Sequence, residues 1–219
     1  MEKLKAELAC VGILPVFCPN DEAQFETFYK AISATEISAV EITLRSDYAL
    51  TAIGELKRRQ PSWLVGAGTI LTDEKALDAL DAGADFLVSP GYDPAFVELV
   101  TKTGKFYLPG CSTPSEIQAA AKHGCTLLKF FPAMISGGSA ALKLYAGAFD
   151  SVSFLPTGGI TLENFTSLLA LSNVVGCGGS FMIHKTMLAA SDADSIANTI
   201  RNCISSYREV KYNENHGIR

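Results

Sequence analysis

Lys129 is a cation inside an otherwise apolar run, Leu127-Leu128-Lys129-Phe130-Phe131, which is typical of a buried β-strand. Burial disfavours the charged ammonium form of a lysine and favours the neutral amine, which is a nucleophile. Such an amine can form a Schiff base with a carbonyl substrate. The alternative is a lysine at a strand end, whose stem packs on the aromatic rings while its head reaches water. The rest of the chain must decide between the two interpretations.

A carboxylate and a guanidinium occur in a second strand-like run, Glu41-Ile42-Thr43-Leu44-Arg45. Because side chains alternate along a strand, Glu41, Thr43 and Arg45 share one face. A carboxylate in this setting can act as a general acid or base, and an arginine can hold a substrate carboxylate through two hydrogen bonds. The alternative is an internal Glu41–Arg45 ion pair that only closes the strand end.

Eight short β-rich runs recur along the chain and alternate with helical patterns. Strands are expected at residues 13–17, 39–44, 64–67, 86–89, 106–109, 127–131, 153–156 and 174–177. Helices are expected at residues 22–33, 49–59, 73–82, 94–103, 114–123, 139–146 and 162–171. Strand–helix units repeated at roughly 20–27 residues, with strands apolar on both faces, predict an α/β protein folded as a (β/α)8 TIM barrel. An open doubly wound sheet is the alternative.

We expect a single domain over residues 1–219, because 219 residues with 48% hydrophobic content can bury a sizeable core and no linker interrupts the pattern. An additional N-terminal helix is expected within residues 1–12. The segment from about 207 to 219 is polar and is expected to form a frayed tail.

Glycine-rich loops follow several of these strands. Gly66-Ala67-Gly68-Thr69 follows the third strand, where the glycines allow close approach of a ligand to the backbone and the Thr69 hydroxyl can bind it. Residues 157–160 and 176–180 follow the seventh and eighth strands, the usual phosphate site of such barrels. Either loop alone is more often a tight turn, but the two together predict phosphate binding. Pro90-Gly91 is interpreted as a turn first and as a pocket wall second.

Composition and charge narrow the class of protein. The net charge is −5 and the basic residues are scattered, which argues against a nucleic-acid or anionic-membrane partner. The charged N-terminus does not resemble a signal peptide, and no stretch is long and apolar enough to span a membrane. Six cysteines without a C-x-x-C pair indicate reduced thiols of a cytoplasmic protein. The three histidines, His123, His184 and His216, lack metal-ligand spacing, so no metal site is expected.

Six motifs, in order along the chain, together resemble the 2-keto-3-deoxy-6-phosphogluconate (KDPG) aldolase family of class I aldolases, which is close to the 6-phosphogalactonate and 4-hydroxy-2-oxoglutarate aldolases. The resemblance extends from about Ile13 to Ile183, and six motifs in register are specific where one would not be. The motifs are Glu41-Ile42-Thr43-Leu44-Arg45, Gly66-Ala67-Gly68-Thr69, Ser89-Pro90-Gly91, Lys129-Phe130-Phe131-Pro132-Ala133, Pro156-Thr157-Gly158-Gly159-Ile160 and Gly178-Gly179-Ser180.

The resemblance implies that Lys129 is the Schiff-base lysine and that Glu41 shuttles protons through water. It implies that Arg45 and Thr69 hold the pyruvate carboxylate. It also implies no cofactor and a homotrimer as the common assembly.

For the rest of the substrate, the resemblance implies that Thr157 influences which stereoisomer is accepted, that Phe131 packs beside the imine and that the Pro90 loop lines the pocket. The residues similar to the family's phosphate-binding set are Gly158, Gly159, Gly179 and Ser180. Two positions depart from the family pattern: Cys18 stands where several relatives carry arginine, and Met134 where many carry glutamate. Both are expected at the rim that meets the sugar acid.

The expected reaction is reversible cleavage of a 2-keto-3-deoxy-6-phospho sugar acid to pyruvate and glyceraldehyde 3-phosphate. The related alternatives are aldolases for 6-phosphogalactonate-type substrates or for 4-hydroxy-2-oxoglutarate. A barrel isomerase or synthase would use Lys129 only as an electrostatic group. A non-catalytic sugar-phosphate-binding barrel would keep the glycine loops without needing Lys129 and Glu41 together.

Overall fold

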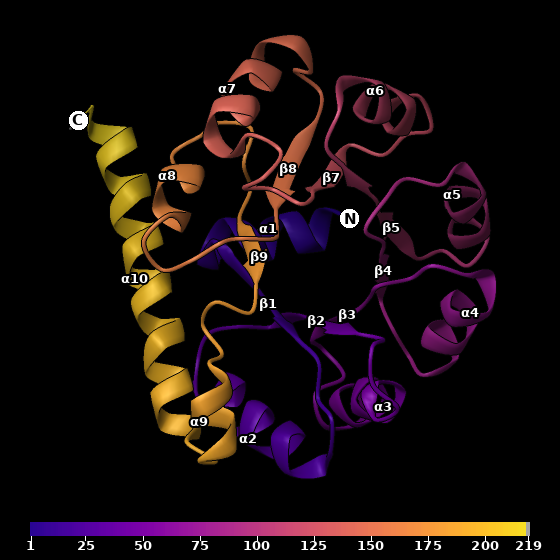
Figure 1. The fold of residues 1–219 in the computed structure, drawn as a ribbon, viewed down its shortest axis with the longest axis vertical. Coiled ribbons are helices and arrows are strands. Elements are labelled where there is room, and N and C mark those ends of the chain that lie inside the picture. The colour runs from indigo at the N-terminus through magenta and orange to yellow at the C-terminus, as the bar shows by residue number, and fades with distance from the viewer. Residues whose placement is uncertain (218–219) are drawn as a thin grey trace.

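Parallel strands form a ring in the computed structural model, which describes residues 1–217 (Figure 1). The strands are β1 (Ile13–Phe17), β2 (Ala39–Thr43), β3 (Leu64–Gly68), β4 (Phe86–Val88), β5 (Phe106–Leu108), β6 (Gly110–Cys111), β7 (Leu127–Phe130), β8 (Ser153–Pro156) and β9 (Cys177–Gly179). They pair in the order β5-β4-β3-β2-β1-β9 and β6-β7-β8. Only Pro109 separates β5 from β6, so these two strands act as one strand of the ring, broken at a residue without an amide N–H.

The ring closes between β8 and β9 through two isolated parallel bridges, Phe154 with Val174 and Thr157 with Gly178. Closure confirms the predicted α/β barrel and excludes the open doubly wound sheet. The eighth strand was expected at residues 174–177 and this placement is wrong, because β9 begins only at Cys177. The physical reason is a change of partner: the Val175 amide donates to Phe154, whereas the Cys177 amide donates to Gly12 beside β1.

Helices surround the ring, and those between residues 22 and 169 carry the chain back between successive strands (Figure 1). They are α1 (Glu2–Val11), α2 (Glu22–Ser33), α3 (Ala49–Arg59), α4 (Asp73–Asp81), α5 (Pro94–Thr101), α6 (Pro114–Lys122), α7 (Gly138–Ala148), α8 (Phe165–Leu169), α9 (Lys185–Ala189) and α10 (Ala193–His216). The expected helix starts at Asp73, Pro94 and Pro114 are confirmed, because the preceding Thr or Asp side chain accepts a backbone N–H in each case. The helix expected at 162–171 is shorter, because Asn164 bonds the Thr161 amide and the Gly159 carbonyl in a turn before α8.

Alternation along the strands separates the barrel interior from the layer beneath the helices. In β2, Ala39 lies in the interior apolar cluster and Glu41 lines a cavity above it. In β7, Leu127 lies in the same cluster and Lys129 lines the same cavity. The residue between each pair, Val40 in β2 and Leu128 in β7, packs outward against the helices. The same two-residue period therefore places an apolar layer at the bottom of the barrel and the polar residues at the carboxyl ends of the strands.

The additional N-terminal helix expected within residues 1–12 is confirmed as α1, which packs against the interior cluster at the end of the barrel opposite the cavity. Its Leu4 and Leu8 are fully buried in the interior cluster with Leu14 and Phe86. In Figure 1, α1 lies across the ring of strands. The cavity lined by Glu41 and Lys129 opens at the opposite end.

The expected frayed tail from Tyr207 is wrong over the described residues, because α10 continues to His216. Tyr207 is buried and donates its hydroxyl to the Ala9 carbonyl at 2.9 Å. Apolar residues at Ile196, Ile200 and Cys203 begin a helical stripe that ends at Tyr207, and this pattern could have predicted the helix. Residues 218 and 219 of the expected tail lie outside the described residues.

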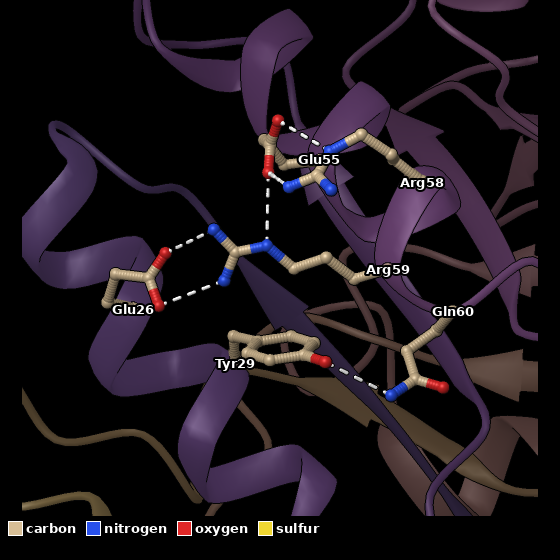
Figure 2. A network of polar contacts seen from close by, with 6 residues as sticks. All are labelled: Glu26, Tyr29, Glu55, Arg58, Arg59 and Gln60. Carbon is tan, nitrogen blue, oxygen red and sulfur yellow. Dashed lines mark hydrogen bonds and ion pairs between the residues drawn. The ribbon is translucent and has the colours of Figure 1, made fainter.

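Helices α2 and α3 are joined by a polar network on the outside of the barrel (Figure 2). Arg59 makes two hydrogen bonds to Glu26, at 2.5 and 2.9 Å, and one to Glu55 at 3.0 Å. Its guanidinium also lies over the rings of Phe25 and Tyr29, 5.2 and 4.9 Å from their centroids. This combination of ion pairs and cation–π contact fixes the two helices that flank β2.

Candidate active site

A cavity of about 260 Å³ opens at the carboxyl ends of the barrel strands. All eleven site residues predicted from the sequence line it. They are Glu41, Arg45, Thr69, Pro90, Lys129, Phe131, Thr157, Gly158, Gly159, Gly179 and Ser180. The barrel thus brings together residues that are up to 139 positions apart in the sequence.

Lys129 and Glu41 meet inside this cavity. The Lys129 Nζ donates to Glu41 Oε1 at 3.2 Å, and the two side chains are 8% and 0% exposed. The Nζ also lies 5.4 Å from the centroid of the Phe131 ring. A buried amine beside a buried carboxylate can exchange a proton directly, which makes both the neutral amine and the carboxylic acid accessible to chemistry.

The second carboxylate oxygen of Glu41, Oε2, is buried and has no hydrogen-bond partner among the described residues. A buried acceptor without a partner is costly, and such atoms are expected where a substrate group or water completes the site. Gly68 packs closely against the Glu41 carboxylate, because a Cβ added at Gly68 would lie 2.1 Å from Oε1. Gly68 is therefore required by the approach of the carboxylate to β3.

Arg45 does not form the internal ion pair with Glu41 that the sequence left open. Its Nε donates to Thr43 Oγ1 at 3.3 Å, and no carboxylate lies within 4.0 Å of its guanidinium in the described part of the chain. Across the same end of the cavity, Thr69 has φ 63°, a left-handed conformation that is uncommon for a β-branched residue. Strained backbone of this kind concentrates at ligand sites. Arg45 and Thr69 together offer a guanidinium and a hydroxyl to a carboxylate.

The opposite end of the cavity is formed by the two glycine-rich loops. Gly158 and Gly159 have φ of 93° and 77°, conformations that favour glycine. A Cβ added at Gly178 would lie 2.6 Å from the Thr157 hydroxyl oxygen, so the two loops are in close contact. Glu41 is the only acidic residue among those that line the cavity. The loop end therefore presents small residues and backbone without a carboxylate that would repel an anion.

Four further residues line the cavity without having been assigned a site role from the sequence: Val16, Thr43, Ile160 and Phe181. The first two follow from strand alternation, since Val16 shares a face with Leu14 and Thr43 with Glu41. No sequence pattern indicated Phe181 as a lining residue, because it follows the last glycine loop as an isolated aromatic residue.

The two departures from the family pattern lie near this cavity but not in its lining. Cys18 lines a neighbouring cavity of about 350 Å³ that shares Val16, Arg45 and Ser180 with the first. Met134 packs against Gly159, because a Cβ added at Gly159 would lie 2.9 Å from the Met134 Cβ. Both residues therefore lie beside the cavity rather than in its lining.

Among residues 1–217, no three or more His, Cys, Asp or Glu side chains are grouped so that they could hold a metal ion. Within the same residues, every helix is too short or too polar to cross a lipid bilayer.

Comparison with known proteins identifies close relatives. The family described as "Aldolase: KDPG and KHG aldolase" matches residues 4–199. A 2-dehydro-3-deoxy-phosphogluconate aldolase of Pseudomonas aeruginosa is 37% identical over 197 residues, which covers 90% of each chain. A KHG/KDPG aldolase of Escherichia coli is 37% identical over 192 residues, covering 88% of this chain and 90% of the other. Among solved structures, a KDPG aldolase of Legionella pneumophila, with pyruvate captured as a covalent carbinolamine, superposes with a TM-score of 0.86 at 31% identity, covering 92% of this chain and 97% of that one.

Proposed function

The chain belongs to the KDPG and KHG aldolase family, and on this premise we propose that it is a class I aldolase that reversibly cleaves a 2-keto-3-deoxy-6-phospho sugar acid to pyruvate and glyceraldehyde 3-phosphate. The observation that carries the proposal is the buried contact between Lys129 Nζ and Glu41 Oε1 at 3.2 Å, inside a cavity lined by a free guanidinium and two glycine loops. A sugar-phosphate-binding barrel without catalysis has no need of this pair.

In the proposed mechanism, the neutral Lys129 amine attacks the C2 ketone and forms a carbinolamine. The Glu41 carboxylic acid, which holds the proton given up by Lys129, then protonates the carbinolamine hydroxyl, and loss of water gives an iminium ion. The positive nitrogen accepts the electron pair of the C3–C4 bond as that bond breaks, while Glu41 takes the proton of the C4 hydroxyl. The C4 fragment leaves as an aldehyde and the C3 fragment remains as an enamine.

Glu41 then returns the proton to C3 of the enamine, and hydrolysis of the resulting imine releases pyruvate and the free lysine. One carboxylate serves both directions because each proton that it takes up is later given back. The partnerless Oε2 supports this role, since it has room for a substrate hydroxyl or a bridging water. The 0% exposure of Glu41 limits exchange of that proton with bulk solvent.

We assign the remaining lining residues by their position along the substrate. Arg45 and Thr69 would hold the pyruvate carboxylate, and Phe131 and Pro90 would form the wall beside the imine. Thr157, the first residue of the glycine-rich loop that follows β8, would contact the carbons that carry the stereochemistry. The phosphate would bind to Gly158, Gly159, Gly179 and Ser180.

The closely related substrates remain alternatives. A relative at the same identity is named for both KHG and KDPG, so 4-hydroxy-2-oxoglutarate is the second substrate to test. The two substrates differ at the distal end, where Cys18 and Met134 lie. We further propose a homotrimer of single-domain subunits, to be tested by analytical ultracentrifugation. A cytoplasmic location is also proposed, since all six cysteines are free.

Borohydride reduction in the presence of pyruvate tests the proposed function. We expect one reduced pyruvate unit per chain, located on Lys129 by peptide mass. Lys129→Met should abolish the adduct, whereas the matched variant Lys185→Met, at the neighbouring cavity, should keep it. An absence of any adduct on the wild-type protein would remove the class I mechanism, and an adduct on another lysine would overturn the assignment of Lys129.

A further inference from the structure

The wall of the catalytic cavity at Pro90 is held by two buried hydroxyl groups. Pro90 and Gly91 form the turn that follows β4, and Pro90 lines the cavity. The Tyr107 hydroxyl, from the neighbouring strand β5, donates to the Gly91 carbonyl at 3.1 Å and lies 2.5 Å from the Ser89 Oγ. Ser89 Oγ also donates to the Gly91 carbonyl. Two hydroxyls thus converge on one carbonyl oxygen of the turn.

Tyr107 and Ser89 are buried, at 4% and 3% exposure, so water does not compete readily for these hydrogen bonds. Burial raises the pKa of Tyr107 well above its usual range, and the hydroxyl therefore keeps the proton that it donates. Register pairs Tyr107 with Leu87, the residue before Val88 at the carboxyl end of β4, and the turn follows that end.

The turn also packs tightly against the neighbouring backbone. A Cβ added at Gly110 would lie 2.1 Å from the Pro90 carbonyl oxygen. The Pro90 turn is therefore fixed on one side by the backbone of Gly110 and on the other by the hydroxyl of Tyr107. Because the turn already packs closely against the Gly110 backbone, a small shift of the tyrosine hydroxyl would move the cavity wall.

Strand order shows which part of the cavity this wall bounds. β4 is adjacent to β3, and β3 to β2, so Pro90 lies on the side of Thr69 and Arg45. The glycine loops after β8 and β9 lie on the other side of the ring. The Pro90 wall therefore faces the end of the cavity that we assigned to pyruvate.

We propose that Tyr107 is a positioning residue for the pyruvate half of the site: its hydroxyl holds the Pro90 turn against the bound keto acid without touching the reacting atoms. This inference rests on the proposed function, because it assumes that pyruvate binds beside Arg45 and Thr69. It predicts an effect on pyruvate binding that is separate from any effect on the phosphate.

The test compares Tyr107→Phe with Tyr207→Phe. Tyr207 is also buried and also donates its hydroxyl to a backbone carbonyl, but it lies at α1 and away from the cavity. For each variant, the pyruvate concentration that gives half-maximal borohydride trapping on Lys129 is measured. The ratio of kcat/KM for the phosphorylated and dephosphorylated substrates and the Tm are measured alongside.

We expect Tyr107→Phe to raise the half-maximal pyruvate concentration by about 3–10-fold, the effect of one lost hydrogen bond. The preference for the phosphorylated substrate should stay within about twofold of the wild-type value, since the glycine loops are untouched. Tyr207→Phe should leave both quantities unchanged. Ser89→Ala, which removes the other hydroxyl, should repeat the effect of Tyr107→Phe on pyruvate.

The proposal is overturned if Tyr107→Phe binds pyruvate as the wild type does, or if Tyr207→Phe weakens trapping equally. It is also overturned if the phosphate preference falls together with pyruvate binding, because the wall would then act on the whole cavity. Absence of trapping in the wild-type protein refutes the proposed function itself, which is a different result from normal trapping in both variants.

Discussion

Replacing Gly68 with alanine should separate the position of Glu41 from the stability of the fold. The added Cβ would lie 2.1 Å from Glu41 Oε1, whereas ordinary contact begins at 3.4 Å, so the oxygen must move by about 1.3 Å. Glu41 is fully buried and cannot swing into solvent. A displacement of this size is enough to break the 3.2 Å hydrogen bond to Lys129. Because a misplacement of about 1 Å can cost roughly 10²-fold in rate, we expect kcat to fall by about 10²-fold.

The assay is release of pyruvate from KDPG, coupled to lactate dehydrogenase, with Tm measured on the same samples. Gly54→Ala is the matched control, because this glycine lies in α3 and its nearest atom to an added Cβ is the Ala82 carbonyl oxygen at 3.7 Å. Alanine there should stabilise the helix by about 0.5–1 kcal/mol and leave kcat unchanged. If Gly68→Ala retained the wild-type kcat and Tm, the argument that the carboxylate must sit at this position would be refuted.

Three further changes address other parts of the molecule. Glu41→Gln should lower kcat by about 10²–10⁴-fold while slower trapping of pyruvate on Lys129 persists, and wild-type turnover would show that Glu41 is only structural. The wild-type protein should prefer the 6-phosphorylated substrate over its dephosphorylated analogue by about 10²-fold in kcat/KM. Ser180→Asp should remove much of this preference, because it places a negative charge among the loops that we propose bind the phosphate. Equal kcat/KM values for the two substrates in the wild type would contradict the phosphate assignment. Arg59→Ala should lower Tm by about 2–4 °C without changing kcat, since it removes the contacts that join α2 to α3 (Figure 2). An unchanged Tm would show that the network adds no stability.

Local sequence patterns were sufficient for the repeating elements of the fold. The helices at 22–33 and 49–59 begin and end at the predicted residues, because amphipathic periodicity and turn residues act within a few positions of one another. The placement of Glu41, Thr43 and Arg45 on one face also followed from the two-residue period of a strand, and all three line the cavity. Glycine loops after two strands were also expected at the carboxyl ends of the strands, and Gly158, Gly159 and Gly179 line the cavity there.

Only the tertiary structure decided which polar groups meet. The sequence left Glu41 free to pair with Arg45 four residues away, but closure of the ring instead brings it to Lys129, 88 positions distant. The eighth strand was misplaced because residues 174–177 change partner between β8 and β1, an event that depends on both neighbours. The apolar stripe that ends at Tyr207 predicts a helix only up to that residue, and the polar segment beyond it was expected to fray; its helix continues to His216 after Tyr207 is buried against α1, at the other end of the chain. Local propensity reports on contacts within one turn or one strand, whereas these three outcomes depend on contacts that exist only once the barrel has closed.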